Sequence, residues 1–206
     1  MPSILALNTG SSTVKFGAFE TARGALTSVM RGRIEFHGPG RRVLSLDTDG
    51  VVLTEAPWVD RGRDTAPDLL RWVEARLTRP VAAVGHRVVH GGPDFSQAVV
   101  ASEAVLDSLA VLTPLAPLHQ QQGLAGVQAL RNAYPDLPQV VAFDTAFHGG
   151  HEPVVDRLGL PRGWEAKGLR RYGFHGLSYE SVAEQLATLD PSTATGRVVT
   201  AHLGSG

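Results

Sequence analysis

Residues 7–16 (LNTGSSTVKF) carry residue types that can bind phosphate, and a short apolar run precedes them. An apolar run, a polar turn and a second apolar stretch predict a β-hairpin whose tip presents polar groups. Gly10 lets a ligand approach the backbone, Ser11 and Thr13 can donate hydrogen bonds, and Lys15 supplies a compact positive charge. Taken alone, the segment fits both a phosphate site and an ordinary polar turn.

Five more segments place polar residues at predicted strand ends or turns along the rest of the chain. They are residues 85–92 (GHRVVHGG), 115–119 (LAPLH), 143–148 (FDTAFH), 170–176 (RRYGFHG) and 202–206 (HLGSG). Phosphoryl transfer needs in-line positioning and neutralisation of charge, with little covalent chemistry from the protein. The cations and hydrogen-bond donors of these segments suit that task.

Arg87 follows the predicted buried strand 81–84, and its planar guanidinium can bind a carboxylate or a phosphoryl oxygen. A structural salt bridge is the alternative role for this arginine. Val88 and Val89, with Leu118, can line a small apolar pocket. Such a pocket favours a methyl group over a longer acyl chain by only ~1–3 kcal/mol per methylene.

Asp144 follows the predicted buried strand 139–143, where nucleotide-dependent enzymes commonly place a carboxylate at a cleft. It can orient a magnesium shell or position the acyl acceptor, or it can cap the next turn. His119, His175 and His202 can each donate a hydrogen bond to charge that develops on a transferring group. Each of these histidines, taken singly, also fits a structural role.

The composition is that of a soluble globular chain: 43% of the 206 residues are hydrophobic, 19% are charged and the formal net charge is -1. Scattered basic residues and a near-zero charge balance argue against nucleic-acid binding. The chain has no cysteine, no signal-peptide pattern and no apolar run of ~18 residues, so we expect a cytoplasmic protein. His148 and His151 are not expected to bind a metal, because the two glycines between them oppose a helix.

The apolar pattern predicts antiparallel strands first and alternating strands and helices later, which is an α/β arrangement. The expected strands are residues 4–7, 14–18, 42–46, 51–53, 81–84, 139–143 and 198–201. The expected helices are residues 67–77, 102–112, 118–133 and 178–189, the last with Ser178 as its N-cap.

In this order and spacing, the motifs resemble the acetate, propionate and butyrate kinase family, and RRYGFHG and FDTAFH are highly specific words. The resemblance extends from Asn8 to Gly206. It implies an α/β fold of the actin-like ATPase (ribonuclease H-like) type, shared with sugar kinases, in which helices flank a mixed sheet. It also implies that residues 1–150 form a first actin-like domain and that residues 151–206 begin a second, so that the chain corresponds to an N-terminal half.

The resemblance implies a role for each matching residue. Asn8 would be associated with Mg²⁺ (or Mn²⁺). The phosphates of ATP would be contacted by Ser11, Thr13, Lys15, His202, Gly204 and Gly206, and the substrate would be bound by Arg87, Val89, Leu118 and His119. The catalytic residues would be Arg87, Asp144 and His175, with His175 stabilising the transition state. Leu177-Ser178-Tyr179, where Thr-Ser-His is expected, and Ser205, where Asn is commonest, affect only fine contacts.

The implied function is reversible transfer of the ATP γ-phosphoryl group to acetate, giving acetyl phosphate and ADP, by a homodimer that binds neither nucleic acid nor membrane. Propionate kinase or another short-chain acyl kinase is the close alternative, and a non-catalytic actin-like module is a third. No Walker A, G-x-G-x-x-G or G-x-S-x-G motif occurs. We expect Asn8, Arg87, His119, Asp144, His175 and His202 to converge on one cleft, and residues 1–206 alone to be inactive.

Overall fold

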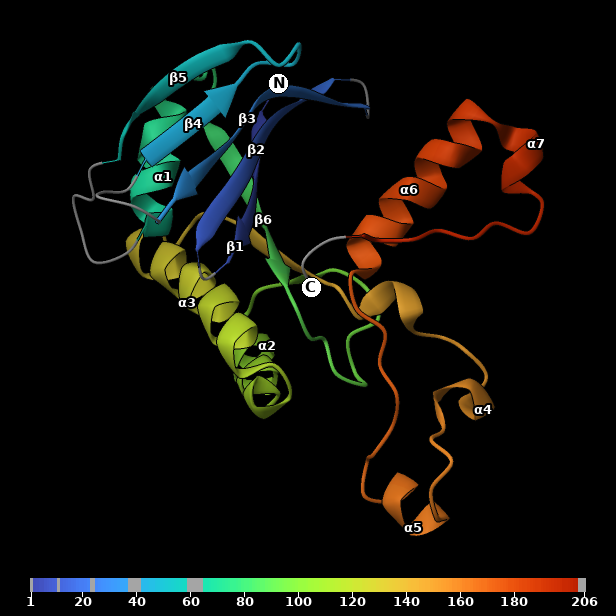
Figure 1. Ribbon diagram of the computed structural model, residues 1–206. Coiled ribbons are helices and arrows are strands. Elements are labelled where there is room, and N and C mark those ends of the chain that lie inside the picture. The colour runs from blue at the N-terminus through green and yellow to red at the C-terminus, as the bar shows by residue number, and fades with distance from the viewer. Residues whose placement is uncertain (1, 11, 23–24, 37–41, 59–64, 204–206) are drawn as a thin grey trace. The chain divides into compact units, whose positions relative to one another are not determined.

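The computed structural model describes residues 2–10, 12–22, 25–36, 42–58 and 65–203. Its chain forms two compact units (Figure 1). The first unit comprises residues 1–88 and 98–142, and the second comprises residues 89–97 and 143–206.

The first unit is built on a mixed sheet with the strand order β5-β4-β3-β2-β1-β6-β8-β7. The strands are β1 (Ser3–Thr9), β2 (Thr13–Ala22), β3 (Ala25–Glu35), β4 (Arg42–Leu46), β5 (Val52–Pro57), β6 (Val81–Val88), β7 (Val99–Val100) and β8 (Gln139–Phe143). The first five strands pair antiparallel in sequence order, whereas β6 pairs parallel with β1. The sheet is therefore a meander that continues into a parallel crossover.

Helices α1 (Thr65–Glu74) and α3 (Pro117–Ala133) supply apolar side chains to the core of this unit. Alternation along the strands determines which side chains face that core: Val14 and Phe16 are buried, whereas Lys15 between them is exposed. The buried members from the strands include Leu5, Leu7, Ala18, Met30, Ile34 and Val43, and those from the helices include Leu69, Leu70, Val73 and Leu130.

Along β3, the alternating pattern would place a core-facing side chain at position 32, but this residue is Gly32. A Cβ atom there would clash with the Leu44 carbonyl oxygen and would lie 2.5 Å from Cζ of Phe16. The Phe16 ring thus fills the space next to the glycine and continues the core across the sheet.

Helix α2 (Glu103–Ala110) begins at Ser102, whose side chain accepts a hydrogen bond from the Val105 backbone N–H. A short 3-10 turn, η1 (Thr113–Leu115), links α2 to α3. Among the described residues, no helix is both long enough and apolar enough to cross a membrane.

The second unit holds short helices joined by extended segments. They are η2 (Ala146–His148), α4 (Pro153–Asp156), α5 (Arg162–Glu165), α6 (Gly176–Leu189) and α7 (Pro191–Ala194). Helix α6 begins after His175, whose φ of 59° places it in the left-handed region.

Most predicted elements are confirmed, including the opening hairpin, the hairpin at 42–53, the four helices and the strand 139–143. Four expectations were incomplete or wrong. Strand β3 was not predicted, and β6 runs on to Val88, so that Arg87 lies on the strand and not after it. Helix α6 starts two residues before Ser178, so Ser178 is not its N-cap. Residues 198–201 form no strand, because none of the described strands pairs with them, and Val199 is 95% exposed.

Candidate active site

Asn8 and Arg87 meet on neighbouring strands of the first unit. β1 and β6 run parallel with Leu7 opposite His86, so the next residue on each strand lies at the same level of the sheet. Nη1 of Arg87 donates a hydrogen bond of 3.0 Å to Oδ1 of Asn8. The fold thereby brings together two predicted site residues from distant parts of the sequence.

Lys15 lies beside this pair on the next strand. In the β1–β2 ladder Asn8 is opposite Lys15, and Lys15 is in turn opposite Arg33 on β3. The turn between the strands is closed by a 3.0 Å hydrogen bond from the Gly10 backbone N–H to the Thr13 carbonyl oxygen. The exposed Lys15 ammonium thus follows a tight hairpin tip, as predicted. Ser11 lies outside the described residues, and the phosphate role of this tip stays a prediction.

His119 is held on the first turn of α3, which approaches β1 and β6 closely through two glycines. A Cβ atom at Gly123 would lie 3.5 Å from the Arg87 carbonyl oxygen, and one at Gly126 would lie 3.2 Å from Oγ1 of Thr9. A Cβ atom at Gly126 would be tighter than most real contacts, whereas one at Gly123 would make ordinary van der Waals contact with β6. Helix α3 therefore presents its exposed first-turn histidine from a fixed position in the first unit.

His86, next to Arg87 on β6, is buried inside the first unit. Its Nε2 atom lies 2.9 Å from the side-chain amide of Gln139 on β8. In the amide orientation that gives both of its atoms partners, the nitrogen of Gln139 donates to His86 and to the Val127 carbonyl oxygen, while its oxygen accepts from the Arg131 backbone N–H. Burial lowers the pKa of His86 to about 4. A neutral imidazole thus links β6 to β8 at the residue next to Arg87.

In the second unit, Asp144 lies against the start of helix α6. Asp144 is buried, and its carbonyl oxygen accepts a 2.7 Å hydrogen bond from the Gly176 backbone N–H. A Cβ atom on Gly176 would clash with that carbonyl and would lie 2.9 Å from Cβ of Phe147. The glycine after His175 therefore permits a close approach that brings the FDTAFH and RRYGFHG segments together.

His175 and His202 stack on each other with ring centroids 4.4 Å apart. Nδ1 of His202 lies 3.2 Å from the Ser178 hydroxyl on α6. Two of the three predicted histidines are thus neighbours at the beginning of this helix. Gly204 and Gly206, also predicted to contact phosphate, lie outside the described residues.

His90, Tyr172 and Thr145 were not singled out from the sequence, yet they connect the motifs within the second unit. The buried His90 ring makes an edge contact with Tyr172, centroid to centroid 4.4 Å, and its Nδ1 accepts from the Gly92 backbone N–H. Oγ1 of Thr145 accepts from the Gly91 backbone N–H at 3.0 Å. Burial lowers the pKa of His90 and raises that of Tyr172. The only sequence signal for these residues was their place inside the motif words.

Of the predicted apolar residues, Val88 and Val89 are buried, whereas Leu118 at the start of α3 is 70% exposed. The described site residues fall into two sets. Asn8, Arg87 and His119 belong to the first unit, and Asp144, His175 and His202 belong to the second. Their convergence on one cleft remains a prediction.

Comparison with known proteins identifies the family of this chain. The sequence model described as the acetokinase family matches residues 3–206. The chain is 43% identical to an acetate kinase of Rhizobium meliloti over 210 residues, covering 100% of this chain and 53% of that protein. It is 36% identical to a propionate kinase of Salmonella agona, covering 100% of this chain and 50% of that protein. The chain thus spans about half the length of these curated relatives.

Solved structures agree with the sequence comparison. The Porphyromonas gingivalis acetate kinase structure matches with a TM-score of 0.77 at 32% identity, covering 92% of this chain and 49% of that one. The Francisella tularensis propionate kinase structure matches with a TM-score of 0.78 at 30% identity and the same coverages. The mixed sheet with flanking helices is an α/β fold of the actin-like ATPase type, as predicted. Within that class, the chain belongs to the acetokinase family.

Proposed function

We propose that the complete protein transfers the γ-phosphoryl group of ATP to acetate, giving acetyl phosphate and ADP, and that it catalyses the reverse reaction. In the forward direction a carboxylate oxygen of acetate forms a bond to the γ-phosphorus, and the bond from that phosphorus to the β,γ-bridging oxygen breaks. The electron pair of the broken bond leaves with ADP. No proton has to be removed from the nucleophile, because acetate is already ionised at neutral pH.

The observation that carries this proposal is the Arg87–Asn8 pair beside Lys15. A guanidinium held at 3.0 Å by an amide oxygen is fixed in orientation, and the planar fork of a guanidinium suits the oxygens of a carboxylate or a phosphoryl group. An exposed ammonium on the adjacent strand adds a second positive charge on the same level of the sheet. Such preorganised cations stabilise the charge that spreads over the transferring group.

The second unit would contribute His175 and Asp144. The left-handed backbone at His175 and the Gly176–Asp144 hydrogen bond hold the histidine and the aspartate in one compact turn. We assign His175 to hydrogen bonding with the equatorial oxygens of the transferring phosphoryl group, with His202 stacked behind it. Asp144 would position the acceptor or the hydrated metal.

Magnesium in phosphoryl-transfer sites keeps several waters and takes only one or two protein oxygens besides the phosphates. The oxygen donors of this chain fit that pattern, since the Asn8 amide oxygen accepts one hydrogen bond from Arg87 and has a second lone pair. Asn8 and Asp144 are the residues that would hold the ion or its waters. When bound, the metal would neutralise charge on the ATP phosphates.

Trapping of acyl phosphate with hydroxylamine tests the function. A longer protein that contains this chain and matches its relatives in length is incubated with Mg-ATP and acetate. Residues 1–206 alone are assayed under the same conditions. We expect acetyl hydroxamate from the longer protein and none from residues 1–206, because phosphoryl transfer requires the whole set of cations and the nucleotide pocket together. Absence of product from the longer protein would favour a non-catalytic actin-like module.

Propionate is the second candidate acceptor, because propionate kinases are among the relatives. One methylene in an apolar pocket changes the ratio of kcat/KM by about 10–200-fold. The ratio of kcat/KM for acetate to that for propionate therefore identifies the preferred acid, and a ratio above about 10 would assign acetate. We also propose a homodimer with a cytoplasmic location, and residues 1–150 and 151–206 as parts of two actin-like domains.

A further inference from the structure

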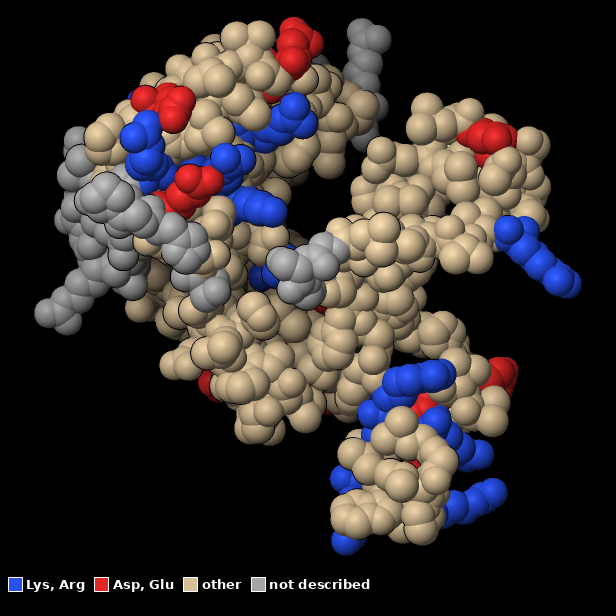
Figure 2. Space-filling model, in the orientation of Figure 1, with Lys and Arg blue, Asp and Glu red and all other residues tan. Residues whose placement is uncertain are grey.

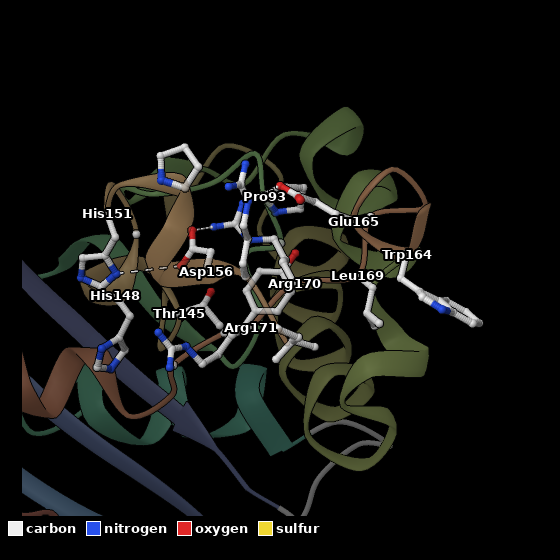
Figure 3. A pocket seen from close by; sticks show the side chains of 18 of the residues that line it. Pro93, Thr145, His148, His151, Asp156, Trp164, Glu165, Leu169, Arg170 and Arg171 are labelled. Carbon is white, nitrogen blue, oxygen red and sulfur yellow. Dashed lines mark hydrogen bonds and ion pairs between the residues drawn. The ribbon is translucent and has the colours of Figure 1, made fainter. Parts of the chain in front are cut away.

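A pocket of about 620 Å³ lies entirely within the second unit (Figure 3). Its wall comes from residues 92–96, from residues 145–151 and from the segment 153–173 that carries α4 and α5. None of the predicted catalytic or phosphate-contacting residues that the structure describes lines it. Its volume lies within the range of sites that bind small molecules.

Arginines dominate the charged part of this wall. Arg157, Arg162, Arg170 and Arg171 line the pocket, whereas Asp156 and Glu165 are the acidic residues of its wall among those that the structure describes. Figure 2 shows Lys and Arg side chains gathered over the segment that carries α4 and α5. A chain with a formal net charge of -1 thus concentrates positive charge around one cavity.

Two of the four guanidiniums are neutralised by the two carboxylates. Nε of Arg157 donates to Oε1 of Glu165 at 3.0 Å, and Arg170 forms an ion pair with Asp156. His151 is the other titratable group near Asp156, with Nδ1 4.0 Å from Oδ1 of that carboxylate. Figure 3 shows His151 and Arg170 with Asp156 in the pocket wall.

The other two guanidiniums, those of Arg162 and Arg171, pair with no carboxylate among residues 65–203 and the other described segments. The Arg171 side chain donates to the Val155 carbonyl oxygen, which carries no net charge. In addition, Nε of Arg170 is buried and has no acceptor within the described part of the chain. A buried donor without an acceptor costs free energy. The donors that a ligand could reach are those of Arg162 and Arg171, which are exposed.

We propose that this pocket binds a small molecule carrying two anionic groups, either phosphate or carboxylate. Two unneutralised guanidiniums match two anionic groups, because each planar fork can form paired hydrogen bonds with one of them. Leu158, Leu160 and Leu169 in the same wall suit a short apolar linker between the groups. This proposal does not depend on acetate phosphorylation by the complete protein.

Isothermal titration of residues 1–206 with pyrophosphate and, separately, with succinate tests the site at low ionic strength. We expect both anions to bind, and the neutral analogue 1,4-butanediol not to bind. The Arg162→Ala/Arg171→Ala variant should lose ~10-fold or more in affinity for both anions, since charge-assisted hydrogen bonds are removed. Arg197→Ala is the matched control, because Arg197 is an exposed arginine of the same unit outside the pocket wall.

Lys15→Ala separates this pocket from the candidate phosphate site of the first unit, and pyrophosphate affinity should survive that change. If Lys15→Ala abolishes binding and the double variant does not, the site lies elsewhere and the proposal is wrong. Equal affinity in all variants, or no binding of either anion at ~10 mM, also overturns it. Should the double variant fail to fold by circular dichroism, Arg162→Glu reverses one exposed charge and should weaken binding in the same direction.

Discussion

The buried His86 should make the first unit less stable in mild acid. Its pKa is about 4 in the folded chain and 6.5 when exposed. Above about pH 6.5 the imidazole is neutral in both states and contributes no pH dependence. Between about pH 6.5 and 4 the unfolded chain takes up a proton that the folded chain does not bind, so stability falls as the pH falls through this window.

The size of the effect follows from the two pKa values. One pKa unit corresponds to ~1.4 kcal/mol, so the loss reaches about 3 kcal/mol at and below pH 4 and about 2 kcal/mol near pH 5. The whole stability of a domain is only about 5–15 kcal/mol, so this one side chain is a large fraction of it. The pKa is lowered by desolvation of a ring that is only 4% exposed, which is why solvent does not screen the effect.

Urea unfolding at a series of pH values measures this dependence. Trp58 and Trp72 belong to the core of the first unit and report its unfolding by fluorescence, and Trp164→Phe removes the tryptophan of the second unit. His86→Gln keeps an amide next to Gln139 but cannot be protonated. The difference in unfolding free energy between the two proteins should change with pH between about 6.5 and 4 by about 3 kcal/mol. Identical pH profiles would refute the assignment of the acid sensitivity to His86.

The remaining predictions concern the Arg87 position and two crowded glycines. In the complete protein, Arg87→Ala should lower the rate of acetyl hydroxamate formation ~10³–10⁵-fold while leaving the thermal midpoint within a few degrees; near-normal turnover would make Arg87 structural. Gly176→Ala should destabilise the second unit by about 1–3 kcal/mol and reduce turnover, whereas Gly163→Ala, with open space around its Cβ position, should do neither. Gly32→Ala should cost the first unit about 1–3 kcal/mol in urea unfolding, while Gly85→Ala on β6 should have a smaller effect; equal effects would contradict the steric argument.

The sequence predicted those elements whose signal is local. The opening hairpin and the strand 139–143 have continuous apolar patterns, and both are confirmed. Strand β3 was missed because Gly32 interrupts its alternation, and the residue that fills the gap, Phe16, comes from the neighbouring strand. The sequence of one segment does not predict packing against a residue from another strand.

The start of α6 was misplaced for a related reason. Ser178 is a favourable N-cap by local preference, but the Asp144 carbonyl oxygen accepts the Gly176 backbone N–H and lets the helix begin earlier. Likewise, the apolar run 198–201 predicted a strand, although a strand needs a neighbour with which to form hydrogen bonds.

The candidate site was predictable as a list of residues and only partly as an arrangement. The motif words indicated Asn8 and Arg87, but nothing in them showed that the guanidinium would donate to the amide at 3.0 Å. His90 was passed over, since a histidine inside a motif gives no sign of whether it faces a ligand or two aromatic rings.

The glycine contacts of α3 also determine which side of that helix faces the sheet. His119, Gly123 and Gly126 follow the spacing i, i+4, i+7, so they share one helical stripe, and the two glycines orient that stripe towards β1 and β6. Each residue of an α-helix turns the chain by about 100°. Deleting a single residue between His119 and Gly123 would therefore swing the histidine about 100° from this stripe while leaving the packing of the glycines intact. The length of this one helical turn should consequently tolerate no insertion or deletion, even though the turn lies at an exposed helix end where changes of length are usually harmless.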